Sequence, residues 1–186
     1  AWPDERLYTT LVRLPKPSGG HRLIALINTM VRIWSRLRRP LSKQWEMKNP
    51  SQAFWGSKPG ATSTDAAFQH NLTAEVARLQ NQESVSVLTD MYKCFETIRL
   101  AVLLQHAREL KFPLRLSWLL LSVYHQPRRV RAYGSCSQAF VSAQGILAGC
   151  THACTMIHLL FFTLLQRLGP MYPHVQPPAP LHDVRC

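Results

Sequence analysis

Residues 84–98 read SVSVLTDMYKCFETI, and this stretch decides the fold that we expect for the chain. Its first six residues are rich in β-branched and apolar side chains, which is typical of a core strand. The predicted strand ends at Asp90, so a sheet would hold this carboxylate in a defined direction. Asp90 is then either a ligand for a hard divalent cation or an N-cap for the next segment, and the local pattern favours neither.

The composition is that of a folded, basic protein. The 186 residues include 22 Lys and Arg against 10 Asp and Glu, which gives a net charge of +12 and a pI near 10.1. With 46% apolar and 17% charged residues, the chain can build a core and is not a disordered polyelectrolyte. Ten basic and three acidic residues fall within 1–48. This surplus favours a polyanionic partner, although a merely soluble basic protein is the alternative.

The cysteine pattern and the apolar runs exclude two further classes. Five scattered cysteines, an odd number, argue against a disulfide scaffold and favour an intracellular reducing compartment. The longest apolar run, 156–165, is far shorter than the roughly 20 residues that cross a bilayer, so no membrane partner is expected. The chain opens at Ala1 and ends at Cys186 after a proline-rich stretch, which indicates a piece of a longer protein.

Turn residues and hydrophobic spacing predict the other elements. They indicate a hairpin at 11–27, a second hairpin with strands at 128–133 and 138–143, and helices from residue 28, over 64–82, 98–110, 114–124 and 148–168. Pro40 is expected to kink or divide the first helix. Two apolar stripes recur at helical spacing, the second predicted to face inward: Met30, Ile33, Trp34, Leu37 and Leu41, then Phe68, Leu72, Val76 and Leu79.

The string from Asp90 to Ile98 resembles the first catalytic motif of reverse transcriptases, most closely the form in non-LTR retrotransposons and group II introns. In that family the aspartate binds the catalytic metal, and an aromatic residue five positions later packs beneath the incoming sugar. The resemblance implies these roles for Asp90 and Phe95, with Phe95 excluding a ribose 2′-hydroxyl. Taken without the motif, Phe95 is more simply a core residue.

Three other segments match the same family in the same order. Residues 14–24 resemble its fingers hairpin, which implies that Lys16 and Arg22 contact template or triphosphate; the alternative is a solvated turn. Residues 52–66 resemble the connection from fingers to palm. Residues 144–150 resemble the second major motif, which implies that Gln144 and Gly145 line the nucleotide pocket. Here Ala148-Gly149-Cys150 replaces the usual Ser-Pro, so the helix entrance is expected to differ.

A competing interpretation concerns the helix predicted at 148–168. Cys150, Cys154 and His158 recur every four residues, with His152 between them, and such a set could ligate Zn²⁺. Structural zinc sites more often draw ligands from two separate elements, and this helix is otherwise apolar. Buried thiols and hydrogen-bonded histidines are therefore the favoured interpretation.

The family's third motif, an aromatic residue and a variable one before paired aspartates, has no full counterpart. The place where it should follow holds PLHDVRC, residues 180–186, with Asp183 as its only acid. Two Mg²⁺ ions need more carboxylates than Asp90 alone provides. The chain as given is expected to be an incomplete catalyst, with Asp90 and Asp183 as the candidate Mg²⁺ ligands.

These observations predict an α/β (α+β) right-hand polymerase fold with fingers, an incomplete palm and no thumb. The expected parts are a fingers-like basic lobe at 1–83, a palm-like lobe at 84–168 with the first two catalytic motifs, and a proline-rich tail at 169–186. The implied function is template-directed DNA synthesis on RNA, with an RNA template, a DNA primer and deoxynucleoside triphosphates as partners. The alternatives are a catalytically dead relative that binds RNA or an RNA:DNA duplex, and an unrelated basic helical scaffold.

Overall fold

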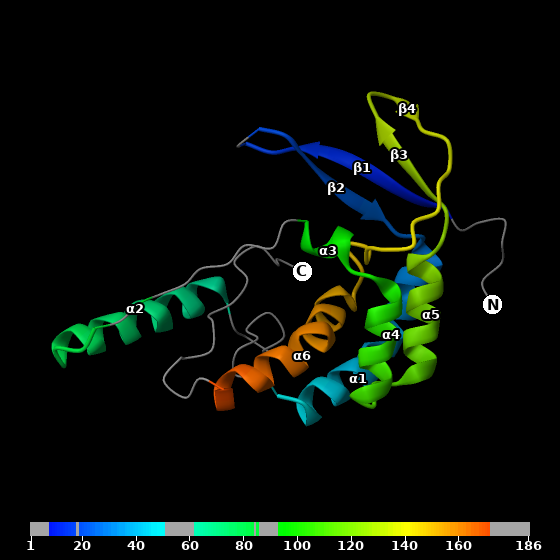
Figure 1. Ribbon diagram of the computed structural model, residues 1–186. Helices are drawn as coiled ribbons and strands as arrows, with labels where there is room; N and C mark the ends of the chain where they lie inside the picture. Colours follow the sequence, from blue (N-terminus) through cyan, green and yellow to red (C-terminus); the bar gives the residue numbers. More distant parts are fainter. Residues whose placement is uncertain (1–7, 18, 51–61, 84, 86–92, 172–186) are drawn as a thin grey trace.

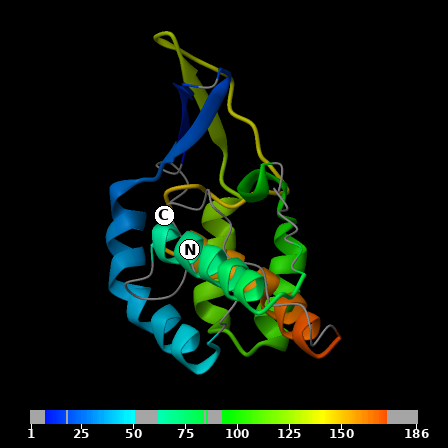
Figure 2. The ribbon, with the colours of Figure 1, turned by 90° about the vertical axis from the view of Figure 1, so that its left-hand side faces the viewer.

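A computed structural model describes residues 8–17, 19–50, 62–83, 85 and 93–171 (Figure 1). It is a mixed α/β structure with a small sheet at one end and a group of helices at the other, as Figures 1 and 2 both show. The short helix α3, Cys94–Thr97, and the chain that leads into α6, Ala153–Met171, lie between the two parts. No helix in the described ranges has the length and apolar character to cross a membrane.

The sheet has the strand order β2-β1-β3-β4 and mixes antiparallel and parallel pairs. The strands are β1, Thr9–Pro15; β2, His21–Leu26; β3, Arg128–Ala132; and β4, Ser135–Cys136. β1 pairs antiparallel with β2, and it pairs parallel with β3, which lies more than 100 residues later in the chain. The sheet therefore draws strands from both of the lobes that the sequence suggests, and that division stays a prediction.

Both predicted hairpins form, the second with a shifted partner. In the first, Gly19 and Gly20 adopt positive φ, and the Gly19 amide donates to the Lys16 carbonyl to close the turn. In the second, Tyr133 and Gly134 take the left-handed turn positions, with φ of +49° and +79°. The chain turns back at once, so the returning strand is β4 and not 138–143. From that later segment, Phe140 forms an isolated bridge with Arg128.

The first helix, α1, runs from Thr29 to Lys48 with Pro40 inside it, so of the two expected effects, a kink or a division, the division does not occur, and a kink stays a prediction. Asn28 caps it by accepting a hydrogen bond from the Met30 amide at 2.9 Å. Its core-facing residues are not the predicted stripe but a mixed set: Val31, Ser35, Ser42 and Trp45. Most of the stripe is exposed, with Trp34 partly buried, because the buried His152, just before α6, hydrogen-bonds Ser42 and the Ser35 carbonyl on the core-facing side.

The second helix, α2, Ser63–Leu79, projects away from the other elements (Figure 1). Thr62 and Asp65 form a reciprocal capping box, so the cap is Thr62 and not Ser63 or Thr64, the residues that the sequence favours. The predicted inward face is exposed, with 65% of Phe68 accessible, and only Ala66 is buried among the α2 side chains that are described. Helical spacing identified this helix correctly, but no described element covers its apolar face.

The core lies between α1, α6 and the helical pair α4, Leu100–Glu109, and α5, Leu114–Tyr124. Trp45 is its centre on α1: the indole packs edge-to-face on Phe112, His158 and Phe162, and its N–H donates to the Leu110 carbonyl. The helical end therefore has a packed core, and α3 and the sheet lie next to it.

Candidate nucleotide and nucleic-acid site

The site is built around α3, which carries Phe95. Lys93 precedes the helix in the left-handed conformation, with φ of +48°, and turns the chain into it. The Phe95 ring is partly buried and packs on the hydrophobic core. Core packing and sugar selection both remain compatible with that position, because one part of the side chain is still accessible.

The turn at Gln144–Ile146 is joined to α3 by its backbone. The Gly145 amide donates to the Ile98 carbonyl at 2.7 Å, and the Ile146 amide donates to the Phe95 carbonyl at 2.8 Å. Gln144 also forms an antiparallel bridge with Arg99. The structure thus brings together Phe95, Gln144 and Gly145, which come from two motifs about 50 residues apart.

Gly145 has a local reason to be glycine. It is buried, its φ is +87°, and a Cβ built on it would lie 2.9 Å from the backbone oxygen of Glu96. The close approach that glycine permits in this structure is therefore to the chain's own backbone. Contact between Gly145 and a nucleotide stays a prediction, as does the role of Gln144, which is exposed.

The turn that follows brings the entrance of α6 to the sheet. Gly149 has φ of +98°, and its Cα faces the Ala25 carbonyl of β2, where a Cβ would lie at 3.5 Å. The Cys150 amide donates to Leu147, and α6 begins only at Ala153, later than the predicted 148. Whether this entrance differs from the family's, as the replacement of Ser-Pro leads us to expect, stays a prediction.

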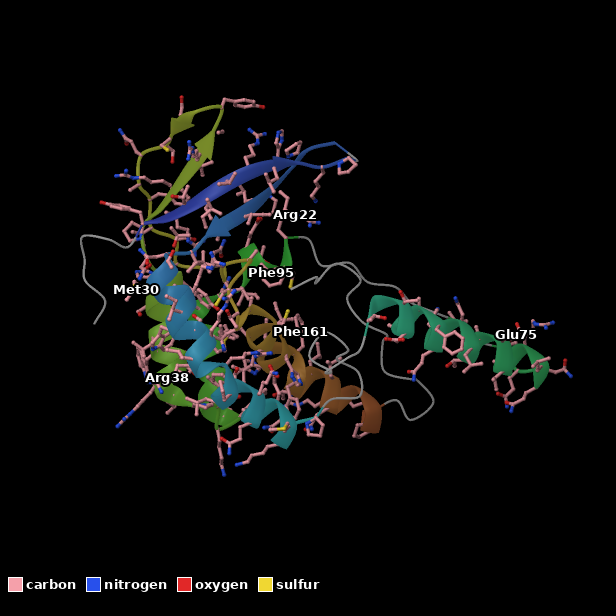
Figure 3. All side chains as sticks on the ribbon, turned by 180° about the vertical axis from the view of Figure 1, so that it is seen from behind. Arg22, Met30, Arg38, Glu75, Phe95 and Phe161 are labelled. Atoms are coloured by element: carbon pink, nitrogen blue, oxygen red, sulfur yellow. The ribbon has the colours of Figure 1, made fainter. Side chains whose placement is uncertain are left out.

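Lys16 and Arg22 are both exposed on the first hairpin, and neither forms an ion pair with a described residue. Figure 3 shows Arg22 on the sheet above α3, the helix that carries Phe95. Free guanidinium and ammonium groups of this kind can bind phosphate oxygens. Their contacts with template or triphosphate stay predictions.

One face of the sheet is basic. Arg22, Arg129 and Arg131 pair directly with Leu14, Thr10 and Val12 of β1. Directly paired residues point to the same side of a sheet, and alternate residues point to opposite sides. The three arginines therefore share the exposed face, opposite to the buried face that carries Leu11, Ala25 and Arg128.

The described residues of the four strands and their turns include no Asp or Glu. Arg129 also stacks over the Tyr8 ring, 4.2 Å from its centroid. At the tip, a cavity of about 210 Å³ is lined by Arg13, Pro15, His21, Ala132 and Tyr133. By the same alternation, Arg13, Pro15 and His21 lie on the side opposite to the basic face. An arginine stacked on an aromatic ring beside other exposed arginines is chemistry that suits single-stranded nucleic acid.

A second cavity, of about 440 Å³, lies below α3. Its lining comes from α3, from the start of α4 and from α6: Cys94, Thr97, Ile98, Arg99, Val102, Leu160 and Phe161. This lining is mainly apolar and has one cation, so it does not suit a triphosphate.

A polar network joins α1 to the first turn of α6 and to His152, the residue before it. Arg39 donates to Glu46 at 3.0 Å and to Thr155 at 2.5 Å, and Thr155 donates to Glu46. His152 hydrogen-bonds Ser42 at 3.1 Å and the Ser35 carbonyl at 3.0 Å. Burial lowers the pKa of His152 to about 4, so its ring is neutral at physiological pH.

The contacts of these residues do not support the zinc interpretation. No group of three or more His, Cys, Asp or Glu able to hold a metal occurs among the described residues. His152 is hydrogen-bonded instead, and the buried Cys150 thiol accepts a hydrogen bond from Tyr124. Cys154 is also buried but is disulfide-bonded, so the prediction of buried free thiols is correct for Cys150 and wrong for Cys154.

The two predicted metal ligands, Asp90 and Asp183, lie outside the described residues, as do the segment 86–89 and most of 52–66. Their placement and their metal binding therefore stay predictions. Sequence reasoning also missed Arg128, a buried arginine that bonds to the Gln144–Gly145 turn. The run Arg128-Arg129-Val130-Arg131 contains one signal that could have found it: in a strand, alternation places Arg128 on the same face as the apolar Val130.

A protein-family model described as reverse transcriptase (RNA-dependent DNA polymerase) matches residues 14–175. Among solved structures, an apo telomerase from Candida Tropicalis, truncated from the C-terminal domain, has a TM-score of 0.58 at 13% sequence identity. The match covers 94% of this chain and 41% of that chain, so the similarity is one of fold and spans less than half of the telomerase structure. A search of curated proteins finds no match. Because the family model covers most of its length, the chain belongs to the reverse transcriptase (RNA-dependent DNA polymerase) family.

Proposed function

We propose that this chain carries the fingers and part of the palm of an RNA-directed DNA polymerase of the non-LTR retrotransposon or group II intron type. Its function is template-directed DNA synthesis on RNA. The observation that carries the proposal is the backbone pairing of Gly145 and Ile146 with Ile98 and Phe95, at 2.7 and 2.8 Å. This pairing joins the segment after Asp90 to the Gln-Gly segment, as a shared nucleotide pocket requires.

In this proposal, the incoming nucleotide lies against α3 and the Gln144–Gly145 turn. The Phe95 ring, held from below by the core, blocks the space that a ribose 2′-hydroxyl would need. Arg22 and Lys16 neutralise phosphate oxygens from the hairpin above. Each role is one of position and charge, which is how phosphoryl transfer is mainly catalysed.

The divalent metal that the family uses would be held by Asp90, with Asp183 as a second candidate ligand. Carboxylate oxygens are the ligands that Mg²⁺ prefers, so the donor type fits. When bound, two such ions stabilise the attacking and leaving oxygens of nucleotidyl transfer. The residues of this chain then need only present carboxylates at the pocket and hold the nucleotide still.

The basic face of the sheet is proposed to hold the RNA template and its duplex with the DNA primer. Its exposed arginines, Arg22, Arg129 and Arg131, have no acidic neighbour on the sheet within the described ranges. Binding that replaces condensed counterions with arginine weakens as salt rises. A protein that kept only this surface would be an RNA-binding relative without activity, which is the second candidate.

One experiment separates these two functions. A labelled DNA primer on an RNA template is titrated at two salt concentrations with the chain and with a version extended at its carboxyl end. Extension is then measured with Mg²⁺ and deoxynucleotides. The variants, made in the extended version, are Asp90→Asn for the metal ligand and Phe95→Val for sugar selection. A polymerase shows incorporation by the extended version that Asp90→Asn abolishes, and Phe95→Val lets ribonucleotides in.

Salt-sensitive binding without incorporation by the extended version would instead favour the binding protein. Incorporation that survives Asp90→Asn would refute the role assigned to that carboxylate. Failure to bind the duplex at low salt would refute both functions.

A further inference from the structure

Arg128 is a buried arginine at the first position of β3, with 8% of its surface exposed. Its Nη2 donates to three main-chain oxygens: Tyr124 at 2.6 Å, Gly145 at 2.9 Å and, at the long limit, Gln144 at 3.5 Å. The first oxygen belongs to the last residue of α5, where the helix dipole favours a positive charge. The other two belong to the turn that faces α3.

A buried cation is costly unless hydrogen bonds replace its water. Among the described residues no carboxylate pairs with Arg128, and its Nε has no hydrogen-bond partner. Burial lowers the pKa of the guanidinium, which nevertheless stays protonated at any physiological pH. The interactions that this side chain makes are therefore its hydrogen bonds to main-chain carbonyl oxygens.

The Gln144–Gly145 turn is held from two sides. On one side the Gly145 amide and the amide of the next residue, Ile146, donate to Ile98 and Phe95, and on the other the carbonyls of Gln144 and Gly145 accept from Arg128. A turn with both its donors and its acceptors engaged has one preferred position. Removal of the guanidinium would leave the Gly145 carbonyl without this donor and free the turn to move, and Phe95 would move with it through the Ile146 hydrogen bond.

We infer that Arg128 is a positioning residue: it fixes the Gln144–Gly145 turn and, through the Ile146–Phe95 hydrogen bond, the ring that faces the incoming sugar. The part concerning the sugar rests on the proposed function. The part concerning the turn rests only on the hydrogen bonds.

The strand does not need this side chain in order to form. The Arg128 amide donates to Phe140 at 2.8 Å, the Phe140 amide returns a bond at 3.0 Å, and β3 pairs in parallel with β1 through its backbone. Substitution of the side chain leaves these bonds in place. Arg129, the next residue, is exposed and touches Tyr8 and not the turn, so it is a matched control.

The variants are Arg128→Met, which keeps the length and loses the donors, Arg128→Lys, which keeps the charge, and the control Arg129→Met. The first measurement is amide hydrogen exchange by NMR on the chain without nucleic acid. We expect Gly145 and Ile146 to exchange about tenfold faster in Arg128→Met, while Leu103 and Leu120 of the core are unchanged, because the loss is local. Arg128→Lys should restore part of the protection.

The second measurement compares the affinity of the next deoxynucleotide with that of its ribonucleotide, on an RNA template with a dideoxy-terminated primer. We expect Arg128→Met to lower this discrimination by about tenfold and to leave the affinity for the duplex unchanged. Arg129→Met should do the reverse and weaken duplex binding alone.

Three results overturn the inference. The first is unchanged exchange at Gly145 and Ile146 in a folded Arg128→Met. The second is faster exchange throughout the core, which would make the role purely structural. If Arg128→Met does not fold, the amide exchange of the turn and of the core is measured on Arg128→Lys instead. The third is local loosening with discrimination intact. A wild-type chain that binds no nucleotide would refute the proposed function, and exchange would still decide whether Arg128 holds the turn.

Discussion

The substitution Gly145→Ala tests the geometry on which the site depends. The backbone of Gly145 has φ of +87°, a conformation that costs an alanine about 1–2 kcal/mol. The new Cβ would also meet three backbone atoms of Glu96, at 2.9, 3.2 and 3.3 Å. Backbone atoms cannot rotate away, so α3 and the turn must separate, which adds about 1–3 kcal/mol.

The free energy of unfolding should therefore fall by about 2–5 kcal/mol, which for a domain of this size lowers Tm by about 5 to 15 °C. Gly134→Ala is the matched control. Its φ is +79°, but no atom lies within 4 Å of the added Cβ, so only the backbone cost of about 1–2 kcal/mol applies. Urea unfolding followed by circular dichroism measures both variants.

The difference between the two variants isolates the contact with Glu96. If Gly145→Ala were no more destabilising than Gly134→Ala, the turn would not be packed on α3. The joint placement of Phe95, Gln144 and Gly145 would then be wrong, and so would the pocket proposed from it.

Two further predictions concern buried and partly buried polar groups at the contact between α1 and α6. The pKa values of His152 and His158 are lowered to about 4, chiefly by burial, so the unfolded chain binds more protons between about pH 6.5 and pH 4. Stability should thus fall as pH falls through this window, by about 2 kcal/mol for each histidine between pH 7 and pH 5, and equal urea midpoints at the two pH values would contradict this. Glu46→Gln removes the charge that faces the partly buried Arg39 and should cost about 1–3 kcal/mol, whereas Glu75→Gln on the exposed face of α2 should change nothing measurable in the same unfolding assay.

Local chemistry accounts for elements that sequence reasoning placed correctly, such as the first hairpin with its turn glycines. The structure adds the caps at Asn28 and Thr62, which are also interactions within a few residues. Their energies depend on neighbours in the chain, so they can be inferred without knowing the fold. The match of ordered motifs to a polymerase family is likewise a property of the string, and the family model confirms it.

Hydrophobic spacing predicted helices well and their buried faces poorly. On α1 the apolar row that includes Met30 and Leu37 is exposed, and Ser35 and Ser42 are buried. The reason is that the turn before α6 places His152 against this helix, and a buried imidazole needs polar partners. The choice of face depended on a residue more than 100 positions away.

From the sequence we could infer that the chain folds, that it is basic, that it has two hairpins and several helices at about their observed places, and to which family its motifs belong. The tertiary structure was needed to show that β3 joins β1 in one sheet, that arginines of β2 and β3 share a face, and that Arg128 reaches the Gln144–Gly145 turn. Turns and caps are short-range interactions that depend on residues close together in the sequence. The pairing of distant strands and the solvation of a buried guanidinium depend on which surfaces meet, and that is settled by the packing of the whole chain.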